Sequence, residues 1–105
     1  MIKETAVCKK LLKYHFPNES FSVKIRRSHD YSRSSDCLMV RITGNTPIDD
    51  VLFVLRNDTF GMCVGRMGKV MFSRDFNSHS MRDPVKNIWV DMGLCEFIEV
   101  GYTYD

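Results

Sequence analysis

The chain lacks the patterns that mark a metal centre, a membrane span or a secreted protein. It has four cysteines, which stand far apart without a C-x-x-C pair: Cys8, Cys37, Cys63 and Cys95. No histidine lies at zinc-ligand spacing from them, so we expect no metal site. Each cysteine lies in an apolar run, which favours buried, reduced thiols over disulfides. No apolar run approaches the roughly 20 residues of a membrane helix, and Lys3 and Glu4 interrupt any signal-peptide core.

Motifs typical of catalysis are also missing. The glycine cluster GMCVGRMGK fails as a phosphate-binding loop, because Cys63 replaces its first glycine and Val70 follows Lys69 in place of Ser or Thr. A hairpin whose glycines adopt positive φ explains this cluster better. His29 and His79 have carboxylates nearby, but both lie in polar loops rather than beside a nucleophile. We therefore expect that the protein is not an enzyme and uses no cofactor.

The chain does have the length of one domain and an uneven distribution of charge. Its 105 residues, 44% of them hydrophobic, predict one globular domain over residues 1–105. Residues 1–41 carry nine basic and four acidic side chains, whereas residues 42–105 carry six basic and nine acidic ones. This asymmetry indicates either an anionic partner for the first half or two solvated faces of opposite sign.

The first half of the chain contains clear helix and strand patterns. Residues 3–15 place apolar side chains at three- and four-residue spacing, and Pro17 ends this predicted helix. Residues 21–27 and 37–43 alternate between apolar and polar side chains, which predicts two half-buried strands. The polar residues 28–36 between them predict a hairpin with a long tip.

A second helix is expected after the turn that follows the hairpin. Thr46 has the chemistry of an N-cap, Pro47 suits the first helical position, and Asp49 completes a pattern similar to a capping box. The apolar stripe of this helix ends at Asn57-Asp58.

The remaining residues are expected to form strands. Residues 60–76 predict a Gly-rich hairpin, residues 73–84 a polar loop, and residues 87–92 and 94–104 two final strands. The element order α-β-β-α-β-β-β predicts an α+β fold. In this fold an antiparallel sheet of four to five strands carries both helices on one face.

The best candidate for a binding site is a basic patch on the outward face of the first hairpin. It contains six residues: Lys24, Arg26, Arg27, Tyr31, Arg33 and Arg41. The cations suit phosphates or the carboxylates of a protein partner, and Tyr31 would stack on a base or a side chain. Lys9, Lys10 and Lys13 enlarge the patch if the first helix borders the same edge. An ordinary solvated sheet face is the alternative.

The segment LLKYHFPNESFSVKIRR, followed by LMVRI, resembles the start of the large-polyvalent-protein-associated domains of phages and conjugative elements. Leu12-Lys13, Phe16-Pro17 and Phe21-Ser22-Val23 match this pattern, and Ser32, Ser34 and Ser35 match its Ser-rich turn. The chain departs from it at Met39-Val40-Arg41, where a Trp is expected. The match covers about a third of the chain and carries no catalytic residues. The resemblance implies an origin in a mobile element.

Together these features predict a small phage or mobile-element protein that inhibits a host nucleic-acid-directed defence enzyme, such as a CRISPR effector or a restriction enzyme. A stand-alone copy of this size is similar to the small anti-CRISPR-like inhibitors with which phages disarm host defence systems, and this step is an analogy. A DNA- or RNA-binding accessory module that uses the same patch is the second hypothesis, and a small enzyme that uses His29 or His79 is the third. We expect a cytoplasmic location, in the host if the protein is phage-encoded, with no membrane association and no small-molecule ligand. The oligomeric state stays open.

Overall fold

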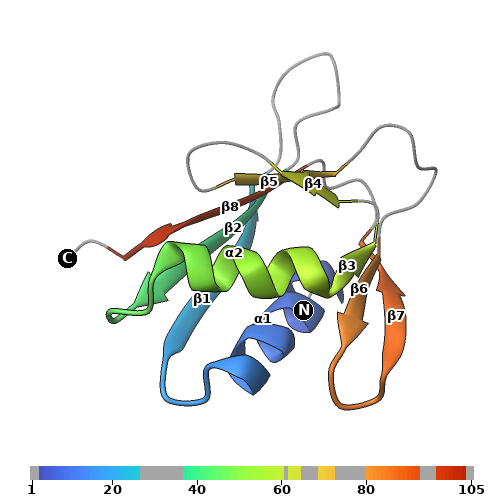
Figure 1. Ribbon diagram of the computed structural model, residues 1–105, viewed down its shortest axis with the longest axis horizontal. Helices are drawn as coiled ribbons and strands as arrows, with labels where there is room; N and C mark the ends of the chain where they lie inside the picture. Colours follow the sequence, from blue (N-terminus) through green and yellow to red (C-terminus); the bar gives the residue numbers. More distant parts are fainter. Residues whose placement is uncertain are drawn as a thin grey trace.

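Two helices and eight short strands appear in the parts of the chain that the computed structural model describes, which are residues 3–26, 37–60, 62–64, 69–72, 80–92 and 97–103 (Figure 1). In chain order the elements are α1 (Lys3–His15), β1 (Ser20–Arg26), β2 (Cys37–Thr43), α2 (Ile48–Asn57), β3 (Thr59–Phe60), β4 (Met62–Val64), β5 (Lys69–Phe72), β6 (Ser80–Asp83), β7 (Ile88–Asp91) and β8 (Phe97–Tyr102).

The larger sheet has five strands in the order β1-β2-β8-β5-β4 among the described residues. β1 and β2 form the predicted antiparallel hairpin, in which Val23 lies opposite Val40. β8 joins β2 in parallel, with Val100 opposite Val40. β5 then pairs antiparallel with β8, and β4 with β5. The sheet is therefore mixed, and β1 is its outer strand on one side.

A smaller sheet is formed by β3, β6 and β7 in that order, within the described part of the chain. Both of its pairings are antiparallel, and Met81 of β6 lies between Thr59 and Val90. A tight turn over residues 84–87 joins β6 to β7, and Asn87 closes it with a φ of 56°. Asparagine tolerates this left-handed conformation better than most residues.

One hydrophobic core connects the two sheets. Its buried residues come from both helices, from the alternating inward positions of β1, β2 and β8, and from Met81 and Met92. α1 contacts both β1 and β6, and Figure 1 shows it between these strands. Leu11 of α1 and Leu55 of α2 are fully buried, so the apolar stripes of the two helices face the same core.

The predicted α+β class with two helices is confirmed, but the prediction of a single antiparallel sheet is wrong. The strands are divided between two sheets, and the β2–β8 pair is parallel. Residues 80–83 form a strand where a polar loop was predicted, because β6 is paired on both sides by β3 and β7. Alternation along one strand indicates its buried face but not its partner, which explains both errors.

Two smaller expectations concern the cysteines and the membrane. Cys8 and Cys37 are buried, as predicted, whereas Cys63 and Cys95 lie outside the residues whose side chains are described. Neither α1 nor α2 is long and apolar enough to cross a membrane, and the described residues contain no other helix.

Candidate partner-binding surface

The predicted basic patch is described for three of its six residues. Lys24 and Arg26 lie exposed on β1, on the face opposite to the core, because Val23 and Ile25, which alternate with them, turn inward. The third residue, Arg41, lies on the same face of β2. The remaining three lie outside the described residues: Arg27, Tyr31 and Arg33.

Arg41 differs from Lys24 and Arg26 because its charge is balanced within the fold. Its Nη2 lies 2.9 Å from Oε1 of Glu99 on β8, and its Nη1 donates a hydrogen bond of 3.0 Å to the carbonyl of Val40. A Cβ atom added at Gly101 would come within 3.4 Å of this guanidinium, so Arg41 lies over the glycine. Its side chain is 28% exposed. Arg41 thus holds β2 to β8 more than it adds charge to the surface.

The lysines of α1 border the same outer strand from the opposite side. Lys9 and Lys13 are exposed and, with Ser20 and Phe21 at the start of β1, line a hollow of about 350 Å³. Nζ of Lys13 donates to the carbonyl of Glu19 at 3.2 Å, which ties the helix to this strand. Cations therefore flank β1 on both sides. We refer to Lys9, Lys13, Lys24 and Arg26 together as the basic edge.

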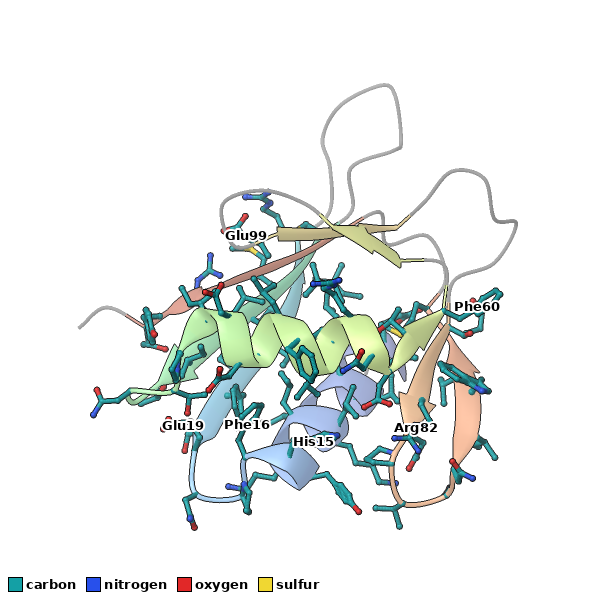
Figure 2. The ribbon with its side chains drawn as sticks, viewed as in Figure 1. His15, Phe16, Glu19, Phe60, Arg82 and Glu99 are labelled. Carbon is teal, nitrogen blue, oxygen red and sulfur yellow. The ribbon has the colours of Figure 1, made fainter. Side chains whose placement is uncertain are left out.

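Glu19 is the acidic residue beside the basic edge, and its carboxylate is turned towards the loop after β2. Oε2 accepts a hydrogen bond of 3.0 Å from the backbone N–H of Thr46 and a second one from its hydroxyl. The hydroxyl bond, helped by backbone N–H groups, lowers the pKa of Glu19. Gly44, at φ +139°, leaves no room for a Cβ atom beside this carboxylate. Figure 2 shows Glu19 near the turn between α1 and β1, far from Phe60 on β3.

This arrangement corrects the predicted start of the second helix. α2 begins at Ile48 with Pro47 as its N-cap, and no side chain caps it. The hydroxyl of Thr46 is instead bonded to Glu19, which is distant in sequence. A capping residue is defined by local spacing, whereas this bond depends on how β1 is placed against the loop.

A groove lies on the other side of α1, between the helix and the turn that joins β6 to β7. Its volume is about 480 Å³, and its lining residues are Ala6, Lys9, Lys10, Lys13, Tyr14 and Val85. Tyr14 is 55% exposed and Val85 is 71% exposed, so the groove presents apolar surface to solvent. Because Lys9 and Lys13 also line the hollow beside β1, the groove adjoins the basic edge.

Asp83 fixes the turn that carries Val85. Its Oδ1 accepts hydrogen bonds from the backbone N–H groups of Val85 and Lys86 at 2.9 and 3.0 Å. Its Oδ2 lies 2.9 Å from Nζ of Lys10 on α1. The backbone bond from Lys86, followed by the bond from Lys10, lowers the pKa of Asp83 to about 2. Sequence reasoning missed this site, although the Asp83-Pro84 pair is a signal for a turn.

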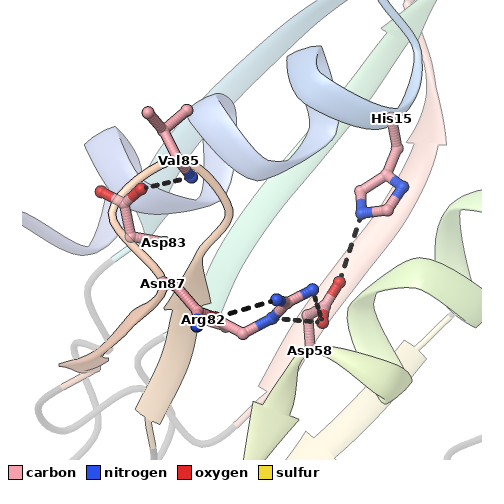
Figure 3. Close-up of polar contacts among 6 residues, drawn as sticks. All are labelled: His15, Asp58, Arg82, Asp83, Val85 and Asn87. Carbon is pink, nitrogen blue, oxygen red and sulfur yellow. Dashed lines mark hydrogen bonds and ion pairs between the residues drawn. The ribbon is translucent and has the colours of Figure 1, made fainter.

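A second polar cluster joins the ends of both helices to β6 (Figure 3). Asp58, just after α2, is buried, and its Oδ2 lies 3.3 Å from Nε2 of His15 at the end of α1. Its Oδ1 accepts a hydrogen bond of 2.9 Å from Nε of Arg82 and forms an ion pair with Nη2 of the same residue, also at 2.9 Å. Nη1 of Arg82 donates to Oδ1 of Asn87 at 3.2 Å. The sequence indicated only that α2 ends near Asp58, because His15 and Arg82, the two partners of this carboxylate, come from distant segments.

His15 is the one histidine that the structure describes. Its contact with Asp58 ties α1 to α2. The two histidines considered for catalysis, His29 and His79, lie outside the described residues. In the described part of the chain, no three His, Cys, Asp or Glu side chains come together in a way that could hold a metal ion.

Comparison of the chain with protein-family models, with curated proteins and with solved structures gave no match.

Proposed function

We propose that this protein is a non-catalytic binding protein of a phage or mobile element, and that it inhibits a nucleic-acid-directed defence enzyme of the host. The basic edge holds an acidic surface of that enzyme. The observation that carries the proposal is the placement of four exposed cations around one outer strand. Lys24 and Arg26 lie on the outward face of β1, and Lys9 and Lys13 line the hollow at its start. The class of the target rests on the sequence resemblance to phage-associated domains.

Exposed cations suit this role for two physical reasons. Each exposed ion pair contributes only about 0.2–1 kcal/mol, but several of one sign steer an acidic partner and accelerate its association. Lys24 and Arg26 also lie on an edge strand, where charged side chains discourage pairing with unrelated strands. The basic edge thus favours association through side chains over addition of a strand.

A cellular assay with charge-reversed variants tests the proposal. Host cells that carry an active CRISPR or restriction system are challenged with phage while they express the wild-type protein. The first variant, called the basic-edge variant, reverses all four charges of the basic edge: Lys9→Glu, Lys13→Glu, Lys24→Glu and Arg26→Glu. The control is Arg56→Glu, which reverses an exposed cation on α2 outside the basic edge.

We expect the wild-type protein and the Arg56→Glu control to raise the plating efficiency of the phage. With the basic-edge variant this increase should be at least about tenfold smaller. Circular dichroism should show that all three proteins are folded, because the substituted side chains are exposed. A wild-type protein that protects phage from none of the systems tested would contradict the proposed function. A basic-edge variant as active as wild type would contradict the assignment of the surface.

Direct nucleic-acid binding is the competing outcome, and a salt titration separates it from protein binding. If the four cations contact phosphates of duplex DNA, log K should fall against log salt with a slope of roughly −3 to −4. The same titration with single-stranded DNA and with RNA covers the remaining nucleic acids. Affinity of this kind without any protein partner would favour the accessory-module hypothesis.

A further inference from the structure

We infer that the groove between α1 and the β6–β7 turn binds one apolar side chain of an acidic peptide segment. This inference rests on the proposed function, and it adds what the protein partner must present: an apolar residue flanked by Asp or Glu. The basic edge would attract the segment, and the groove would anchor it.

The groove offers a place for an apolar side chain because its lining is mainly carbon. Ala6 and Val85 supply aliphatic surface, Tyr14 supplies a ring, and the lysines add the methylene parts of their side chains. Two of these residues, Tyr14 and Val85, are more than half exposed in the chain by itself. Covering them with a Leu-sized side chain would remove apolar surface from water, which favours the complex.

The charge around the groove selects an acidic partner. Lys9 and Lys13 are exposed at its rim, while the ammonium group of Lys10 is held by Asp83 at 2.9 Å. The same Lys9 and Lys13 border the hollow beside β1. Glu19 also lines this hollow, but its carboxylate is bonded to Thr46. A segment lying on the basic edge can therefore place a neighbouring residue in the groove.

The groove is also rigid on the side of the turn, which lowers the cost of binding. Asp83 accepts backbone hydrogen bonds from Val85 and Lys86, and its carbonyl accepts one of 2.8 Å from the N–H of Asn87. Its ion pair with Lys10 fixes the distance between the turn and α1. A backbone turn that is already ordered loses little entropy when a partner binds.

The lining favours a peptide over a nucleic acid or a lipid surface. A nucleic-acid groove requires polar contacts along its length, whereas Ala6 and Val85 provide none through their side chains. Insertion into a membrane requires a larger apolar face of a helix, whereas the exposed face of α1 carries Lys9 and Lys13. A short apolar contact surrounded by lysines matches one apolar residue between carboxylates.

NMR titration of the isotopically labelled protein tests the inference with two matched peptides. The first peptide consists of Asp and Glu residues with one central Leu, and the second has Ser in place of Leu. The protein is titrated as wild type, as Val85→Asp, as Val85→Ser and as Ile88→Asp. Ile88 is an exposed apolar residue of β7 that does not line the groove, so its substitution is the control.

We expect the Leu peptide to bind wild type about tenfold more tightly than the Ser peptide, with shifts at Ala6, Tyr14 and Val85. Both Val85 variants should remove this difference, and Ile88→Asp should retain it. Lys9→Glu with Lys13→Glu should weaken both peptides. Because Val85 is mostly exposed, the amide spectra of its variants should remain those of a folded protein.

Equal binding of the two peptides, still lost in the double lysine variant, would overturn the groove inference and leave the charge-based proposed function standing. Shifts at the groove only with nucleic acid or with anionic vesicles would also overturn it. Failure of the proposed function has a different signature, which is a wild-type protein without effect on phage plating.

Discussion

At the residue scale, two carboxylates illustrate how backbone groups hold a charge in place. Glu19 and Asp83 both accept hydrogen bonds from backbone N–H groups, and the pKa of each is lowered. Hydrogen bonds to the ionised form favour that form, so both carboxyls stay charged in mild acid. Their function is to organise a loop or turn, because Glu19 holds the segment before α2 and Asp83 the β6–β7 turn.

Asp83→Asn is expected to make the stability of the protein less sensitive to acid. The pKa of Asp83 is lowered from 3.8 to about 2 on folding, so its stabilising contribution is present above about pH 4 and is lost as the pH falls through about 2. Urea-unfolding midpoints should therefore fall more steeply for wild type than for the variant over this range. Asparagine keeps an acceptor for the turn, so the variant should fold at neutral pH. Equal slopes for the two proteins would show that Asp83 does not dominate the loss of stability in acid.

At the scale of secondary-structure elements, Asp58 joins three separate segments. It follows α2, pairs with His15 at the end of α1 and accepts hydrogen bonds from Arg82 of β6. The backbone repeats the connection, because the N–H of Arg82 donates to the carbonyl of Asp58 at 2.8 Å. The smaller sheet is thereby fastened to both helices at one point.

Asp58→Ala should lower the free energy of unfolding by about 2 kcal/mol, because it leaves Arg82 without its buried acceptor. The value lies below that of a fully buried pair, since His15 and Arg82 each expose about a third of their side chains. Urea unfolding measures it, and a double-mutant cycle with Arg82→Ala gives the coupling. Asp49→Ala, at an exposed position of α2, is the control and should cost less than about 1 kcal/mol. Equal losses for the two variants would contradict this role of Asp58.

At the scale of the whole molecule, the two sheets share one core through α1. Leu11 is fully buried in a cluster that also contains Val40 of the larger sheet and Met81 of the smaller one. A domain with one core of this kind unfolds as a unit.

Leu11→Ala should therefore destabilise both sheets together, by about 2–5 kcal/mol. Trp89 on β7 is the only tryptophan in the sequence, so its fluorescence reports on the smaller sheet, while circular dichroism reports mainly on the helices. The two signals should give the same midpoint in urea, in wild type and in the variant. Tyr14→Ala, on the exposed side of the same helix, should cost less than about 1 kcal/mol. Separate midpoints for the two signals would indicate two independently folding parts.

Local patterns in the sequence were enough to predict α1, β1, β2 and α2, because each depends on the spacing of apolar residues within a few turns or strand positions. They also placed Lys24 and Arg26 correctly on the outward face of β1. Periodicity reports which face of an element is buried, and this is a property of neighbouring residues.

Only the tertiary structure decided which elements meet. Arg41 and Glu99 are 58 residues apart, and Lys10 and Asp83 are 73 residues apart. In both pairs the interacting side-chain nitrogen and oxygen nevertheless lie 2.9 Å from each other. The first pair requires β8 to lie beside β2, and the second requires the β6–β7 turn to lie against α1. Such pairings depend on how apolar faces from distant segments pack into one core, and no local spacing encodes that packing.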